Sequence, residues 1–84
     1  MINEIVKGIA ERRCKQYGCE VAFLERSEAM PDRRELIYVD GIEIDITNWS
    51  IRICNAGWMT QAELAALAHT IECVRCILKS AQHV

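Results

Sequence analysis

Cysteine and histidine side chains are the residues of this chain best suited to hold a metal ion. His69, Cys73 and Cys76 are spaced by four and three residues, so on a helix they would share one stripe. Cys14 and Cys19 could add two more thiolates, which makes a zinc site one hypothesis. However, the Cys-x-x-Cys pair falls inside a strongly periodic helical segment, whereas zinc knuckles usually lie in turns.

Two other roles are open to the same cysteines. A reactive Cys-x-x-Cys usually begins a helix, where the helix dipole lowers the thiol pKa, but Cys73 follows roughly three turns of its predicted helix. Free cysteine is among the most buried residue types and fills small spaces in cores. We therefore predict buried thiols, with no metal and no cofactor.

Acid–base chemistry would need a pair of carboxylates. Glu43 and Asp45 are two residues apart in a segment typical of a strand, so both should point to the same side. A solvated strand face explains this pattern better. The sequence lacks GxSxG, GxxxxGK[ST], GxGxxG and HExxH. We therefore expect a protein that is not an enzyme.

The acidic residues in the middle of the chain suggest a docking surface instead. Several carboxylates around one hairpin would suit a protein partner with a basic groove. Two tryptophans flank the junction between the sheet and the last helix, and tryptophan is enriched in binding hot spots. The candidate partner-binding residues are therefore Glu35, Asp40, Glu43, Asp45, Trp49 and Trp58.

Two helices are predicted at the ends of the chain. Apolar residues recur at helical spacing over residues 2–17, and Gly18 is placed to end that helix. Thr60 and Glu63 have the spacing of a capping box, which begins a helix over residues 60–82. Its large apolar stripe is expected to pack on the core, and its small-residue side against the first helix or a second copy of the chain. The large stripe comprises Leu64, Leu67, Ile71, Val74, Leu78 and Ala81.

Alternating residues between the helices predict an antiparallel sheet. Residues 19–26, 35–39 and 42–46 read as strands, and Asp40-Gly41 favours a type I′ hairpin. Residues 49–54 are predicted as a fourth strand, with a short helix as the alternative. We therefore expect a single α+β domain over residues 1–84, a two-layer sandwich of helix, three- or four-stranded antiparallel sheet and long C-terminal helix.

Charge and composition exclude several function classes. Residues 20–45 carry eight acids against three arginines, the opposite of the usual balance in nucleic-acid binders. No stretch approaches the roughly 20 apolar residues of a membrane span. The charged N-terminal segment does not resemble a signal peptide. We expect a cytoplasmic protein with reduced thiols.

The leading hypothesis is a small protein-binding module that can form a homodimer through its C-terminal helix. Domains of this size without catalytic motifs are common in phages and mobile elements, where they often inhibit host machinery as anti-defence or anti-CRISPR proteins. A zinc-stabilised module is one alternative. A nucleic-acid-binding regulator is the other, and its basic residues would be Arg12, Arg13, Lys15, Arg33 and Arg34.

Overall fold

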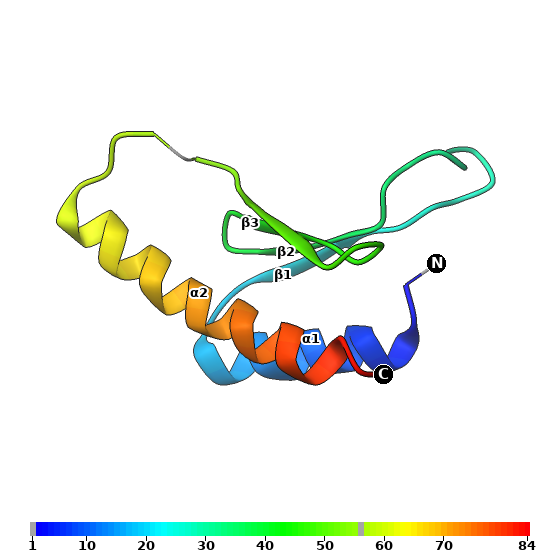
Figure 1. Cartoon of the computed structure of the whole chain (residues 1–84), viewed down its shortest axis with the longest axis horizontal. Coiled ribbons are helices and arrows are strands. Elements are labelled where there is room, and N and C mark those ends of the chain that lie inside the picture. Colours follow the sequence, from blue (N-terminus) through cyan, green and yellow to red (C-terminus); the bar gives the residue numbers. More distant parts are fainter. Residues whose placement is uncertain (1, 56) are drawn as a thin grey trace.

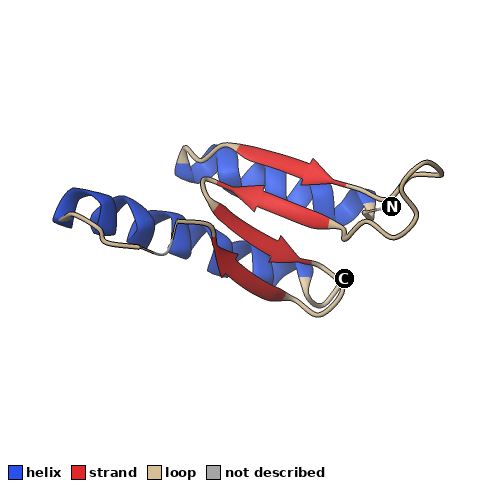
Figure 2. Cartoon of the chain, turned by 90° about the horizontal axis from the view of Figure 1, so that it is seen from above, coloured by secondary structure: helices blue, strands red, loops and turns tan. Residues whose placement is uncertain are grey.

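The described part of the chain contains two terminal helices and four strands. The computed structural model describes residues 2–55 and 57–84. The elements are α1 (Glu4–Tyr17), β1 (Val21–Leu24), β2 (Leu36–Val39), β3 (Ile42–Asp45), β4 (Ser50–Ile53) and α2 (Gln61–Ala81). The strands form an antiparallel sheet in the order β1-β2-β3-β4, with both helices against one face (Figures 1 and 2). The predicted α+β layout is confirmed. In the described part of the chain, no helix combines the length and apolar character needed to cross a membrane.

Helix α1 begins and ends where local capping chemistry requires. The Asn3 side chain accepts a hydrogen bond of 2.7 Å from the Ile5 N–H. Gly18 follows the last turn with a left-handed φ of 70°, and its N–H bonds to the Cys14 and Lys15 carbonyls. The predicted helix and its terminating glycine are thus confirmed.

The hairpins set the register of the sheet. Asp40 and Gly41 have φ values of 41° and 84°, as a type I′ turn requires. The fourth strand is confirmed, but it begins at Ser50 because Trp49 has a left-handed φ of 57° and belongs to the turn. Cross-strand partners share a face, so one apolar face packs on the helices. That face comprises Val21, Phe23, Ile37, Val39, Ile42, Ile44, Ile51 and Ile53.

Helix α2 is rotated relative to the sequence prediction. Its buried residues form a line between the predicted large apolar stripe and the predicted small-residue side of the helix. They are Thr70, Cys73, Val74, Ile77 and Ala81. The expectation that the large stripe packs on the core is therefore wrong in part. Leu64 is 57% exposed, and Ile71 and Leu78 are only half-buried.

Two features of the packing explain which residues of α2 are buried and which stay exposed. Helix α1 lies beside α2, where Tyr17 Oη is 3.1 Å from Cys76 Sγ, so the small-residue side faces α1. Strands of four residues span about 13 Å and cannot cover a 21-residue helix of about 31 Å. The N-terminal half of α2 consequently extends past the end of the sheet (Figure 1).

The cap of α2 supports a first prediction. Thr60 Oγ1 accepts from the Glu63 N–H and Glu63 Oε1 accepts from the Thr60 N–H, both at 3.1 Å. Thr60→Ala should lower the free energy of unfolding by about 1 kcal/mol. Thr60→Ser, which keeps the hydroxyl, should stay close to the parent in urea denaturation. Equal losses from both substitutions would contradict a role for the hydroxyl.

Candidate functional site

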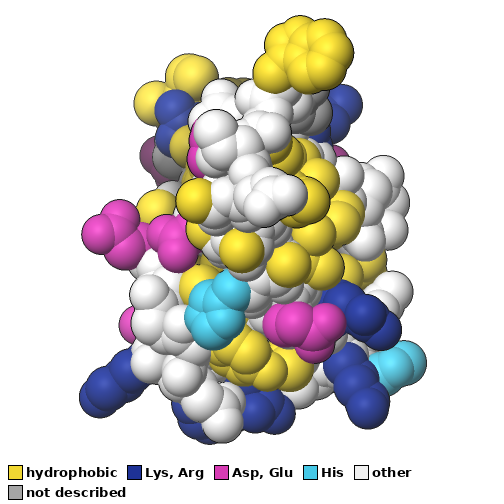
Figure 3. All heavy atoms as spheres, turned by 90° about the vertical axis from the view of Figure 1, so that its left-hand side faces the viewer, with side chains coloured by type: hydrophobic (Ala, Val, Ile, Leu, Met, Phe, Trp, Pro, Cys, Tyr) yellow, Lys and Arg dark blue, Asp and Glu magenta, His cyan; other side chains and the backbone are white. Residues whose placement is uncertain are grey.

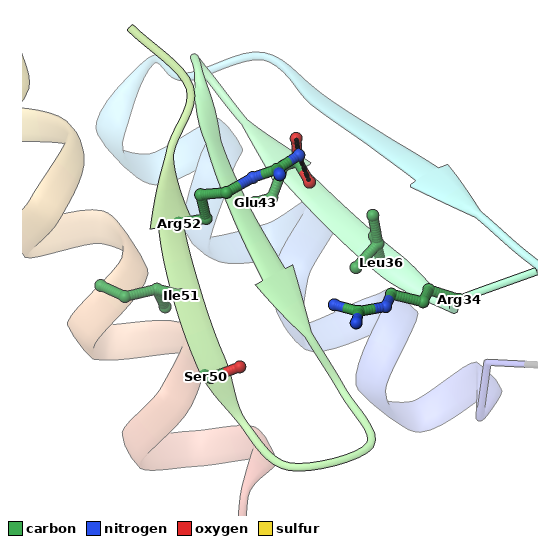
Figure 4. A pocket seen from close by; sticks show the side chains of 6 residues that line it. All are labelled: Arg34, Leu36, Glu43, Ser50, Ile51 and Arg52. Carbon is green, nitrogen blue, oxygen red and sulfur yellow. Dashed lines mark hydrogen bonds and ion pairs between the residues drawn. The ribbon is translucent and has the colours of Figure 1, made fainter. Parts of the chain in front are cut away.

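The sheet face turned away from the helices carries two of the predicted carboxylates. Arg52 Nη2 lies 2.8 and 3.0 Å from the two oxygens of Glu43, and Arg34 Nη1 lies 3.6 Å from Asp45 Oδ2. Arg52, Glu43 and Arg34 line a pocket with a volume of about 300 Å³. Figure 4 shows the Arg52 side chain reaching over to Glu43, with Arg34 at the other side of the pocket. Hydrogen bonds from Arg52 and then from the Cys54 thiol lower the pKa of Glu43, which favours its ionised form. This face carries both signs of charge and is not simply acidic.

The other predicted partner-binding residues lie elsewhere. Glu35 precedes β2 and is only 8% exposed, so it adds little charge to the surface. Asp40 is exposed in the hairpin turn, where Oδ1 accepts from the Glu20 N–H at 3.1 Å. Trp49 is half-buried against the core, whereas Trp58 is 103% exposed. The structure therefore separates the predicted set instead of joining it in one patch.

A groove at one end of the molecule was not predicted from the sequence. It lies between the β2–β3 hairpin end and the projecting half of α2, and its volume is about 330 Å³. Figure 3 views this end of the molecule, where hydrophobic side chains gather over the surface. We call it the end groove. Its apolar lining includes Ile53, Met59, Ala66 and Leu67, and Asp40 and Glu63 add carboxylates.

The end groove depends on segments that are far apart in the sequence. Asp40 belongs to the hairpin and Leu67 to α2, so their approach follows from tertiary packing. One signal was available, because the first turns of α2 are rich in alanine and hold few large apolar residues that could pack in a core. That signal indicates an uncovered helix, but it does not locate a groove.

The cysteines behave mainly as core residues. Cys14, Cys19 and Cys73 are buried, and the Sγ atoms of Cys14 and Cys73 are 3.9 Å apart. Burial raises the pKa of Cys19 and of Cys73 to about 12, so both remain thiols at neutral pH. The core positions predicted for these three residues are confirmed, whereas Cys54 is exposed.

The remaining candidate metal ligands do not converge on that cluster. Cys76 contacts the Tyr17 hydroxyl at 3.1 Å, and His69 Nε2 lies 2.7 Å from the Tyr17 carbonyl oxygen. Over residues 2–55 and 57–84, no group of three or more His, Cys, Asp or Glu side chains is arranged to hold a metal. The geometry gives the zinc hypothesis no support.

The basic residues of the nucleic-acid hypothesis lie on two different layers. Arg13 belongs to α1, where Nη1 bonds to Gln16 and Nη2 bonds to Ser80. Arg34 pairs with Asp45 on the open face of the sheet. The two basic clusters therefore do not form the single positive face that binding to a nucleic-acid backbone requires.

No family model matches the chain, and comparisons with curated proteins and with solved structures also find no match. What the protein does must therefore be inferred from its own surfaces. Three of them stand out: the end groove with Trp58 beside it, the open sheet face, and the exposed side of α2.

Proposed function

We propose that the chain is a non-catalytic protein-binding module that engages its partner through the end groove and Trp58. The complete exposure of Trp58 is the observation that carries this proposal. A solvated tryptophan leaves a large apolar ring system in water, and burying such a ring at an interface is strongly favourable. Met59, the next residue, is 37% exposed and lines the groove, so anchor and groove are continuous.

The lining of the end groove suggests the chemistry of the partner. Ile53 and Leu67 offer an apolar surface for a side chain of moderate size. Asp40 and Glu63 add negative charge, and hydrogen bonds from Thr60 lower the pKa of Glu63, which keeps it ionised. The best fit is a protein segment with an apolar residue next to lysine or arginine. A basic partner surface was also expected from the sequence, but at the acidic sheet face and not at this groove.

The open sheet face is a second candidate surface. Arginine is enriched in binding hot spots, and the side chains of Arg34 and Arg52 are 80% and 75% exposed. Because each of them also pairs with a carboxylate, a partner at this face would need groups of both charges. An inhibitor of host machinery of the anti-CRISPR type would act by covering a protein surface in this way.

Five free cysteines fit a reducing compartment such as the cytoplasm.

The test is affinity purification from cells that express the tagged chain. Trp58→Ser should lower recovery of the specific partner at least about tenfold, because hot-spot truncations cost about 2 kcal/mol or more. Trp58→Phe, which keeps an aromatic ring, should retain most of the binding. Both variants should unfold at the same temperature as the parent, since Trp58 makes little contact with the core.

A charge reversal identifies which surface is used. Glu43→Lys with Asp45→Lys changes the open sheet face and leaves the end groove intact. If this double variant loses the partner while Trp58→Ser retains it, the sheet face is the binding site and the end-groove proposal is wrong.

A further inference from the structure

One side of α2 presents a regular row of large apolar residues that its own chain leaves partly uncovered. Leu64, Ile71 and Leu78 are seven residues apart, so they point in nearly the same direction from the helix. Leu64 is 57% exposed, and Ile71 and Leu78 are half-buried. We call these three residues the open flank.

The first helix and the sheet cover the open flank only in part, because Ile71 and Leu78 pack against the core whereas Leu64 stays exposed. Helix α1 occupies another side of α2, where it contacts Cys73 and Cys76. The core packs on the line through Val74 and Ile77, which are 1% and 0% exposed. Leu64 also belongs to the first turns of α2, which begins at Gln61, and the N-terminal half of this helix extends beyond the strands (Figure 1). Covering the rest of the row, above all Leu64, therefore requires a second molecule.

The total exposed area indicates how large that cover should be. The chain exposes 5896 Å², whereas a compact monomer of 9.6 kDa exposes about 5,100 Å². The difference, about 800 Å², is the area that one partner contributes to a standard stable interface. The shape agrees, with extents of 42 × 25 × 19 Å and a radius of gyration of 13.1 Å against about 12 Å for a compact domain.

We propose that a second copy of this chain covers the open flank, in an antiparallel pair of α2 helices centred on Ile71. The row is symmetric about that residue, so a twofold axis there places Leu64 against Leu78 of the partner subunit. Each projecting half-helix then lies along the half-buried part of the other α2. This inference goes beyond the proposed function, because none of the three residues of the open flank lines the end groove, although Leu67 of the groove lies next to the flank on the helix.

The charge of this surface fits a copy of itself. An interface between identical faces must not repel itself, and the three residues of the open flank are uncharged. Glu72 and Arg75, which are 3.6 Å apart, border the flank with opposite charges. A face of a single sign would instead require a partner of the other sign. The uncharged row therefore favours self-association.

The first experiment measures subunit number by analytical ultracentrifugation over a range of protein concentrations. The wild-type chain should sediment as a dimer, with twice the mass of 9.6 kDa. Leu64→Glu should raise the dimer dissociation constant at least about a hundredfold, because two carboxylates would enter an apolar contact. Ala65→Glu is the matched control, since Ala65 is exposed and lies about 100° around the helix from Leu64.

Two results would overturn the proposal. The first is a wild-type chain that remains monomeric up to submillimolar concentration. The second is a dimer that Leu64→Glu does not weaken, for instance one joined through the free edge of β4. Because Leu64 is exposed in the single chain, its substitution should leave folding intact, and circular dichroism checks this.

A second experiment tests the antiparallel arrangement. Ile71→Cys, in a background where the exposed Cys54 is replaced by serine, should form a disulfide-linked dimer when oxidised glutathione is added. Two thiols then yield one disulfide, and the oxidant is reduced to two glutathione molecules. Ala65→Cys in the same background should remain uncrosslinked. A dimer that Ile71→Cys cannot crosslink would exclude a pair centred on that residue.

Loss of partner binding in Trp58→Ser with the dimer intact would show that the end groove and the open flank act independently.

Discussion

Raising the pH from 8 to about 10.5 is expected to lower the free energy of unfolding by about 2 to 4 kcal/mol. Burial raises the pKa of Cys19 and of Cys73 to about 12 in the folded chain. In the unfolded chain the same thiols would titrate at about 8.5. Between these values the unfolded state loses protons that the folded state keeps, so alkaline pH favours unfolding.

The sign and the pH window follow from these two pKa values. The stabilisation is complete below about pH 8.5 and is lost as the pH rises towards 12. The lower figure of the range applies if one thiol dominates, because a Cys73 thiolate disfavours ionisation of Cys19 and raises its pKa. Guanidinium denaturation in a reductant, repeated at several pH values, gives the slope directly.

The control for this prediction removes both thiols. The double variant Cys19→Ala with Cys73→Ala should be less stable at pH 8, because buried volume is lost, but its stability should depend much less on pH. The raised pKa of Cys14 leaves some alkaline dependence in the variant. If the wild type and the double variant show the same slope, these thiols are accessible to hydroxide in the folded chain, contrary to their buried positions.

Replacing Ile44 by alanine is expected to lower the free energy of unfolding by about 3 kcal/mol. Ile44 is 0% exposed in β3, and Ile37 and Ile51 are its cross-strand partners on the same face. The substitution removes apolar contacts and leaves a cavity in the middle of the sheet. Urea denaturation with a fixed m-value measures the loss.

Ile51 provides a matched control on the same face. It is the same residue type, but it is 46% exposed in the edge strand β4. Ile51→Ala should cost less than about 1 kcal/mol, since much of its side chain is already in water. Equal losses at the two positions would mean that the edge of β4 is as deeply buried as β3.

The elements that the sequence predicted correctly depend on interactions between near neighbours. The capping box joins Thr60 to Glu63, and the hairpin turn needs only Asp40 and Gly41 to adopt positive φ. Gly18 ends α1 for a similarly local reason. The left-handed φ of Trp49 had no comparable signal, because tryptophan rarely adopts that conformation, and the start of β4 was therefore misplaced by one residue.

The candidate site could be predicted only in part. Alternation correctly put Glu43 and Asp45 on one face of the sheet, where their side chains are 12% and 14% exposed, and strand register pairs Glu43 with Arg52. The pairing of Arg34 with Asp45 was not predictable, since Arg34 comes from the loop before β2 and its side chain is positioned by the folded sheet. The face expected to be acidic therefore carries compensating positive charges.

The sequence by itself determined the order of helices and strands, the turns and the alternation of the sheet, because these depend on residues a few positions apart. The tertiary structure decided which side of α2 is buried, since α2 has two apolar stripes and the packing of α1 against the helix puts the buried line between them. It also decided that the strands are too short to cover the helix. The end groove and the open flank both result from this mismatch in length, a property of the packed chain that no local pattern encodes.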